Sequence, residues 1–173
     1  MSLSDLALYD KVAIVTGAGR GIGRAIALGL SEAGASVVVA SRTSSEIEAT
    51  AADIRNQGRQ SYAVPTDVVD SRQVNNLVNR TLAEFGQIDI LINNAGGGMA
   101  PINKPIWDIT DEEWKHGIDL ELTGTFYGCR TVGKHMVQRK QGKIINMSSA
   151  FGIVGGKDYP VYCSAKAGVI LLT

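Results

Sequence analysis

Five short runs rich in valine and isoleucine recur along the chain and constrain its fold more than any other feature. They are KVAIVT (11–16), SVVVAS (36–41), QSYAVP (60–65), IDILIN (88–93) and KIINMS (143–148). Each run is bounded by Gly, Pro, Asn or Ser and is too short and too β-branched to favour a helix. Runs that are apolar on both faces are typical of strands in a parallel sheet, where helices cover both sides.

Amphipathic patterns with helical spacing separate these runs. One of them, residues 46–57, leads to Gly58, a plausible C-terminal cap. Another begins at Ser71, which we expect to cap it, and ends at Gly86. Because strands alternate with helices, we predict an α/β fold with a doubly wound, Rossmann-like parallel sheet, in a single domain over residues 1–173.

Composition excludes several classes of protein. Seventeen basic and seventeen acidic side chains cancel, so the chain has no electrostatic footprint for nucleic acid or an anionic membrane. Cys129 and Cys163 form neither a disulfide framework nor a metal-binding box, and they suit a reducing compartment. The N-terminus lacks the features of a signal peptide, and no run approaches the roughly 20 apolar residues of a membrane span. We expect a soluble cytoplasmic protein with no metal, nucleic-acid partner or membrane contact.

The segment TGAGRGIG (16–23) follows the first apolar run and precedes a helical pattern. Glycines let the backbone approach a phosphate closely, and a helix N-terminus supplies unpaired N–H groups and a positive dipole end. The strand–turn–helix setting favours nucleotide binding, and a tight turn without a ligand is the alternative. The spacing is G-x-x-x-G-x-G, and the predicted binding residues here are Gly17, Arg20, Gly21, Ile22 and Gly23.

The end of the second apolar run bears on the choice of cofactor. An Asp or Glu about 20 residues beyond the glycine motif would bind a ribose 2′-OH and favour NAD. This chain instead has Ser41, Arg42 and Thr43, with no acid before Glu46. Arg42 can form charge-assisted hydrogen bonds to a 2′-phosphate, and Arg20 supplies a second cation. We predict that NADP(H) is preferred and NAD(H) is possible, with Ser41 and Arg42 among the cofactor-binding residues.

Tyr162 and Lys166 lie four positions apart and therefore share one face of a helix. A free phenol holds its proton too tightly to act as a base near neutral pH. A neighbouring ammonium stabilises the phenolate, so Tyr162 can exchange a proton with a carbonyl or hydroxyl oxygen. For an isolated pair of this kind, surface packing is the alternative. Tyr159 has no lysine four residues further on.

Five signals stand in one order along the chain: TGAGRGIG (16–23), DV (67–68), NNAG (93–96), NMSSAFG (146–152) and YCSAK (162–166). In this order they resemble the short-chain dehydrogenase/reductase family, of the kind with a single extended Rossmann domain. The resemblance spans almost the entire chain. It implies an oxidoreductase that interconverts a secondary alcohol and a carbonyl by hydride transfer with a nicotinamide cofactor, for which the two arginines favour NADP(H). It also implies Tyr162 as general acid/base and assembly as a homo-oligomer, a dimer or a tetramer.

The resemblance assigns further roles. Lys166 would also hold the nicotinamide ribose hydroxyls, and Ser149, thirteen residues before Tyr162, would orient the reacting oxygen. Ser148 is the competing choice, although the spacing to Tyr162 favours Ser149. We expect Asn93 to tie strands together. The remaining cofactor residues that it implies are Asp67, Val68, Asn94, Ala95 and Gly96, with an ordinary strand-end turn as the alternative for the first two.

One residue departs from the family pattern. Glu121 stands where the family usually carries an asparagine, which is thought to hold a water that relays protons to the lysine. A glutamate can hold a water as well, or pair with Lys166, or point elsewhere, so its catalytic role is left open. A nucleotide-binding protein with little or no catalysis is therefore the alternative function.

The family pattern also continues beyond the residues of this chain. Its C-terminal strands and the segment that covers the substrate have no counterpart after Thr173, so we expect the chain to be C-terminally incomplete. The apolar run at 169–172 is then expected to pack in an interface. The glycine-rich segment 96–110 is a candidate binding loop, with a flexible surface loop as the alternative. We expect the residues that select the substrate to lie in this segment and in the part of the family pattern after Thr173.

Overall fold

In the computed structural model, described for residues 8–97 and 104–173, five strands form one parallel sheet. Each predicted strand is present within two residues at either end, and the prediction of a doubly wound α/β fold is confirmed. The strand order is β3-β2-β1-β4-β5. The strands are β1 (Val12–Thr16), β2 (Ser36–Ser41), β3 (Ser61–Pro65), β4 (Ile90–Asn93) and β5 (Lys143–Asn146).

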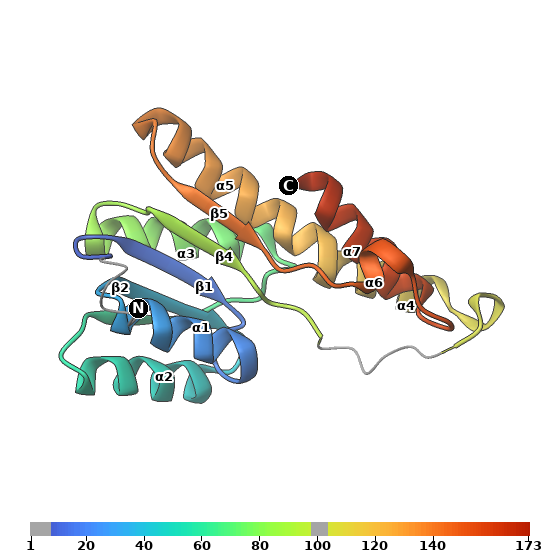
Figure 1. Ribbon diagram of the computed structural model, residues 1–173, viewed down its shortest axis with the longest axis horizontal. Coiled ribbons are helices and arrows are strands. Elements are labelled where there is room, and N and C mark those ends of the chain that lie inside the picture. The colour runs from blue at the N-terminus through green and yellow to red at the C-terminus, as the bar shows by residue number, and fades with distance from the viewer. Residues whose placement is uncertain (1–7, 98–103) are drawn as a thin grey trace.

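Helices cover both faces of this sheet (Figure 1). One face carries α1 (Gly21–Glu32) and α2 (Ser44–Asn56), and the other carries α3 (Ser71–Phe85) and α5 (Gly124–Arg139). None of the helices within the described ranges is long and apolar enough to cross a membrane. The other helical elements are the 3₁₀ turn η2 (Ile106–Asp108), α4 (Asp111–Ile118), the π-helical turn η3 (Asp119–Thr123), α6 (Phe151–Val154) and α7 (Pro160–Leu172).

Alternation along the strands divides the core into two layers. In β2, Val37 and Val39 pack with Ile47 of α2 in one cluster, whereas Val38 packs with Leu77 of α3 in the other. All five side chains are almost fully buried. Because successive strand residues point to opposite faces, a strand with helices on both sides is apolar at every position. This is the physical reason for the continuous valine and isoleucine runs.

The start of α3 corrects one prediction. Asp70, and not Ser71, is the N-cap, and its carboxylate accepts a hydrogen bond from the Arg72 backbone N–H at 2.9 Å. Hydrogen bonds from the Arg72 side chain and backbone lower the pKa of Asp70 to about 2. Ser71 is the first helical residue. The predicted end at Gly86 is confirmed, with a left-handed φ of 74°.

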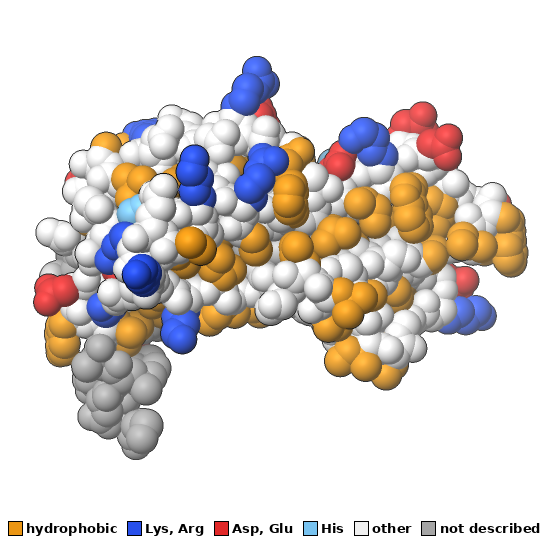
Figure 2. Space-filling model, turned by 90° about the horizontal axis from the view of Figure 1, so that it is seen from above, with side chains coloured by type: hydrophobic (Ala, Val, Ile, Leu, Met, Phe, Trp, Pro, Cys, Tyr) orange, Lys and Arg blue, Asp and Glu red, His pale blue; other side chains and the backbone are white. Residues whose placement is uncertain are grey.

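The segment 96–110, a candidate binding loop from its sequence, is described only in part. Residues 98–103 lie outside the described ranges, and Ile106–Asp108 form a 3₁₀ turn. Several large apolar side chains lie on the surface, and Figure 2 shows such side chains gathered over the half of the molecule that carries α4, α6 and α7. They include Trp107, Ile153, Val154 and Leu171, each more than three-quarters exposed.

One buried carboxylate joins three elements at the opposite end of the sheet from the strands' carboxyl ends. Asp89, which is 4% exposed, accepts hydrogen bonds from the Val12 N–H at 3.0 Å and from Arg139 Nη2 at 3.1 Å. Arg139 Nη1 also donates to the Ile88 carbonyl at 2.9 Å. The carboxylate thus ties the start of β1 and the segment before β4 to the end of α5.

Replacing Asp89 by alanine is expected to lower the free energy of unfolding by about 3 kcal/mol, because it leaves a partly buried guanidinium without its charge partner. Urea unfolding followed by circular dichroism measures this change. Glu84→Ala, at an exposed position of α3, is the matched control and is expected to change stability by less than about 0.5 kcal/mol. Equal effects of the two substitutions would contradict the tethering role of Asp89.

Candidate active site

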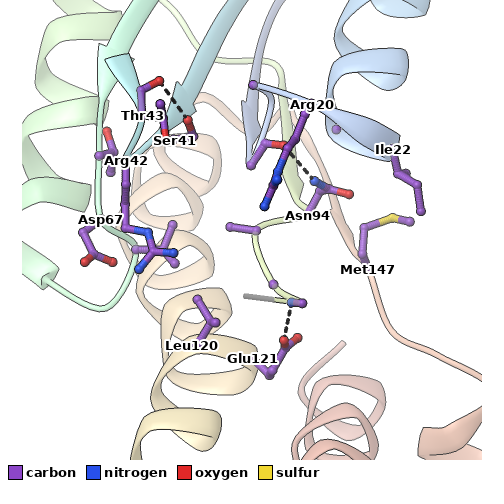
Figure 3. Close-up of a pocket in the computed structure, with 18 of the residues that line it drawn as sticks. Arg20, Ile22, Ser41, Arg42, Thr43, Asp67, Asn94, Leu120, Glu121 and Met147 are labelled. Carbon is purple, nitrogen blue, oxygen red and sulfur yellow. Dashed lines mark hydrogen bonds between the residues drawn. The ribbon is translucent and has the colours of Figure 1, made fainter. Parts of the chain in front are cut away.

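A cavity of about 450 Å³ lies at the carboxyl ends of the strands, where the strand order reverses between β1 and β4 (Figure 3). Open α/β sheets bind ligands at this switch point, because the crossovers on either side diverge there. All predicted site residues except Gly21 and Ser149 line the cavity: Gly17, Arg20, Ile22, Gly23, Ser41, Arg42, Asp67, Val68, Asn94, Ala95, Gly96, Glu121, Tyr162 and Lys166.

The backbone of the glycine turn packs so closely against neighbouring atoms that Gly17 and Gly23 have no room for a Cβ atom. A Cβ on Gly23 would lie 2.2 Å from the Gly17 carbonyl oxygen, and Gly17 itself has a left-handed φ of 66°. Helix α1 begins at Gly21, and its N-cap, Arg20, makes no side-chain capping hydrogen bond. The N–H groups of the first turn are therefore left for a ligand with acceptor oxygens, such as a phosphate. Gly21 has a left-handed φ of 54°, a backbone conformation that favours glycine in this turn, and it does not line the cavity.

Asn94 connects the two central strands at this point. Its backbone N–H donates to Thr16 Oγ1 at 3.0 Å, and its side-chain Nδ2 donates to the Thr16 carbonyl at 3.0 Å. The Ala95 N–H donates to the same hydroxyl oxygen, also at 3.0 Å. Asn93 donates to Asn146 Oδ1 at 2.8 Å, so it joins the ends of β4 and β5 in the manner expected from the sequence.

One end of the cavity carries the residues predicted to select the cofactor. Figure 3 shows Arg42 and Asp67 side by side there, with Arg20 projecting from the glycine turn. Both arginines are exposed, which leaves their guanidinium groups accessible. Glu46, from the first turn of α2, also lines the cavity and packs over Gly19, whose Cβ would lie 2.8 Å from the Glu46 carboxylate oxygen Oε2. Sequence reasoning noted Glu46 only as the first acid after the strand.

The opposite wall carries the Tyr162–Lys166 pair on α7. Lys166 Nζ lies 5.6 Å from the centre of the Tyr162 ring and donates a hydrogen bond to the Met147 carbonyl at 2.8 Å. It also lies 2.9 Å from Glu121 Oε2, and the two side chains are 7% and 6% exposed. The helix therefore presents an ammonium beside a phenol, as the four-residue spacing predicted, with a carboxylate as a third member.

The two serines after β5 have different partners. Ser148 lines the cavity and donates to the Lys166 carbonyl oxygen at 2.8 Å, so it anchors α7 to the end of the sheet. Ser149 does not line the cavity, and its Oγ accepts a hydrogen bond from the Phe151 N–H at 3.2 Å. The predicted role of Ser149 in orienting a substrate stays a prediction.

The residues present fit a dinucleotide. The open N-terminus of α1 suits a phosphate, the two arginines suit a charged adenosine end, and Lys166 suits ribose hydroxyls. The Glu121 carboxylate lines the same cavity and is paired with Lys166 Nζ, 2.9 Å from Oε2. Within the described ranges, no group of three His, Cys, Asp or Glu residues is placed to hold a metal ion.

This fold, with a glycine turn and a Tyr–Lys pair on one cavity, defines a dinucleotide-binding oxidoreductase class. The family model described as short chain dehydrogenase matches residues 11–173, and the chain belongs to this family of NAD(P)-dependent oxidoreductases. The predicted family is therefore confirmed.

Individual relatives share much of the sequence. A 3-oxoacyl-(acyl-carrier-protein) reductase of Synechocystis is 40% identical over 96% of this chain and 67% of that protein. One of Staphylococcus aureus is 38% identical over 94% of this chain and 65% of that protein. The chain thus spans about two thirds of the length of these curated relatives.

Solved structures agree with this assignment. A putative short-chain alcohol dehydrogenase of Sinorhizobium meliloti superposes with a TM-score of 0.91 at 33% identity, covering 97% of this chain and 66% of that one. An NAD⁺-bound xylitol dehydrogenase gives a TM-score of 0.90 at 31% identity, covering 95% of this chain and 63% of that one.

Gly23→Ala is expected to lower the free energy of unfolding by about 1–3 kcal/mol, because the new methyl group overlaps the Gly17 carbonyl. The same overlap displaces the turn and weakens binding of NADPH. Thermal unfolding and NADPH fluorescence titration measure the two effects. Gly29→Ala is the matched control in the same helix, since its Cβ meets no atom within 4 Å. Unchanged NADPH affinity in Gly23→Ala would contradict the role of the turn.

Proposed function

We propose that the protein is an NADP(H)-dependent oxidoreductase that interconverts a secondary alcohol and a carbonyl. One observation carries the proposal: the glycine turn and the Tyr162–Lys166 pair, far apart in the sequence, line the same cavity. Phosphate binding and proton transfer therefore take place in one site. The names of the relatives describe reduction of an oxo group and dehydrogenation of alcohols, which are the same chemical interconversion.

In this proposal the bound cofactor supplies or accepts a hydride at the carbon that carries the reacting oxygen. Tyr162 donates a proton to the carbonyl oxygen in reduction and takes it back in oxidation, so the charges balance. Lys166 stabilises the phenolate form of Tyr162 through its ammonium, 5.6 Å from the ring centre. Ser149 accepts from Phe151 N–H, which leaves its own hydroxyl hydrogen to donate to the developing charge on the substrate oxygen.

The preference for NADP(H) over NAD(H) is part of the proposal. Arg20 and Arg42 line the cavity from two different elements, so a 2′-phosphate between them would receive charge-assisted hydrogen bonds. Glu46 lines the same cavity and opposes this effect, because a carboxylate repels a phosphate and accepts from a ribose hydroxyl. The two arginines outweigh one carboxylate, and binding of NAD(H) remains compatible with Glu46.

A second candidate function is nucleotide binding with little turnover. The Glu121–Lys166 ion pair favours it, because a carboxylate 2.9 Å away competes with the cofactor and with Tyr162 for the ammonium. Turnover by the unmodified protein decides between the two candidates.

Assembly as a homo-oligomer and a single-domain organisation are also parts of the proposal. Apolar residues of η3, α5 and α7 line an open groove of about 420 Å³, and two of them, Phe126 and Leu171, are 40% and 89% exposed. Surfaces of this kind pack against other protein surfaces. The run at 169–172 contributes Leu171 and Leu172 to the groove.

Tyr162→Phe is expected to lower turnover about a hundredfold or more, because it removes the transferable proton. The NADPH affinity should stay unchanged, since the phenyl ring keeps its packing. The measurement is NADPH consumption with a panel of carbonyl compounds, together with NADPH titration. Tyr159→Phe is the control, because Tyr159 packs on Phe151 and does not line the cavity. Full activity in Tyr162→Phe would reject the proposed function.

Arg42→Ala is expected to reduce the ratio of NADPH affinity to NADH affinity about tenfold to hundredfold, the effect of losing charge-assisted hydrogen bonds. Titration with both cofactors gives this ratio directly. Arg59→Ala is the matched control, because Arg59 lies over the Tyr9 ring and away from the cavity. A clear preference for NADH in the unmodified protein would overturn the role given to Arg42.

A further inference from the structure

Glu121 and Lys166 form a buried ion pair between two elements that are distant in the sequence. Glu121 belongs to the π-helical turn η3, and Lys166 belongs to α7. The atoms Oε2 and Nζ lie 2.9 Å apart, and the side chains are 6% and 7% exposed. Because water is largely excluded, the two charges offset one another with less screening than a surface pair would experience.

The carboxylate is held from a second side by the loop after β4. Its Oε1 accepts a hydrogen bond from the Gly97 N–H, drawn as a dashed line in Figure 3. A Cβ on Gly96 would lie 2.5 Å from Oε2, so only glycine allows this approach. The π-helical turn, a feature that often marks functional sites, holds Glu121 in the wall of the cavity.

The two charged groups of this pair face each other directly. Glu121 Oε2 lies 2.9 Å from Lys166 Nζ, and the ammonium also directs a hydrogen bond to the Met147 carbonyl at 2.8 Å. The carboxylate therefore offsets the charge of the ammonium within the wall of the cavity.

Other charges lie elsewhere in the cavity wall. Figure 3 shows Arg42 and Asp67 across the cavity from Glu121. The wall near Tyr162 therefore takes its charge, among the described residues, from Lys166 and Glu121, and the two charges sum to zero. The four other charged side chains of the wall are Arg20, Arg42, Glu46 and Asp67.

We infer that Glu121 raises the affinity of this site for the oxidised form of the nicotinamide cofactor, relative to the reduced form, compared with a neutral residue at the same position. The inference rests on the proposed function, which puts the nicotinamide beside Tyr162 and Lys166. The oxidised ring carries one more positive charge than the reduced ring, and an uncompensated ammonium repels that charge. Glu121 removes the repulsion. The neutral asparagine of the resembled family pattern would leave the ammonium's charge in place, so Glu121 sets the relative affinity for the two redox states.

The test compares Glu121→Gln with the unmodified protein by calorimetric titration of NADP⁺ and of NADPH. The ratio of the NADP⁺ dissociation constant to the NADPH dissociation constant is expected to rise about fivefold, the effect of one unit charge acting across roughly 10 Å at an effective dielectric constant of about 35. The ratio cancels general effects on folding and on phosphate binding, because both cofactor forms share them. Glu121→Asn makes the same charge change in a smaller side chain and is used if Glu121→Gln does not fold.

Two further variants separate charge at this position from other effects. Glu46→Gln removes a carboxylate from a different part of the same cavity wall, and its ratio is expected to equal that of the unmodified protein. The double variant Glu121→Gln with Lys166→Met removes both charges of the pair, and its ratio is expected to return to the original value.

The outcomes of this experiment are distinguishable. A raised ratio in Glu121→Gln that returns in the double variant supports the inference. An unchanged ratio with both cofactor forms still bound overturns the inference and leaves the proposed function standing. Failure of the unmodified protein to bind either form overturns the proposed function and this inference with it.

Discussion

The hydroxyl of Thr16 holds together the two strands on which the site depends. It accepts hydrogen bonds from the Asn94 and Ala95 N–H groups and donates to the Ile92 carbonyl at 3.3 Å. The glycine turn follows β1 and the loop of Asn94 follows β4, so this contact sets the distance between them. A parallel sheet brings the carboxyl ends of all its strands to one edge, and the reversal of strand order opens the cavity at this contact.

Helix α7 is attached to this edge through Lys166. The Lys166 carbonyl accepts from Ser148, its ammonium donates to the Met147 carbonyl, and the same ammonium pairs with Glu121. The first two partners follow β5, and the third comes from η3 before α5. One residue thus makes three contacts with two segments, and the position of Tyr162 one turn earlier on α7 follows from them. The position of the Tyr162 phenol is therefore coupled to the packing of α7 against the segment after β5 and against η3.

Much of the fold was predictable because its signals are local. Strand runs, the glycine turn and the stop at Gly86 depend on β-branching and on left-handed backbone, which are properties of single residues. The predicted cap of α3, Ser71, was wrong, since Asp70 and Ser71 are both good capping residues and the backbone angles select Asp70. Most predicted site residues line one cavity, but the proximity of Glu46 to Gly19 depends on how α2 packs, which no local pattern reports.

The sequence by itself determined the succession of strands and helices along the chain, the glycine turn and the spacing of Tyr162 and Lys166, because these depend on neighbours along the chain. Only the tertiary structure decided where Glu121 points. Its partner Lys166 lies on α7, which is separated from Glu121 in the sequence by α5 and β5. The buried ion pair forms only when folding removes both side chains from water together. The sequence left the role of Glu121 open, and the folded protein pairs its carboxylate with the Lys166 ammonium.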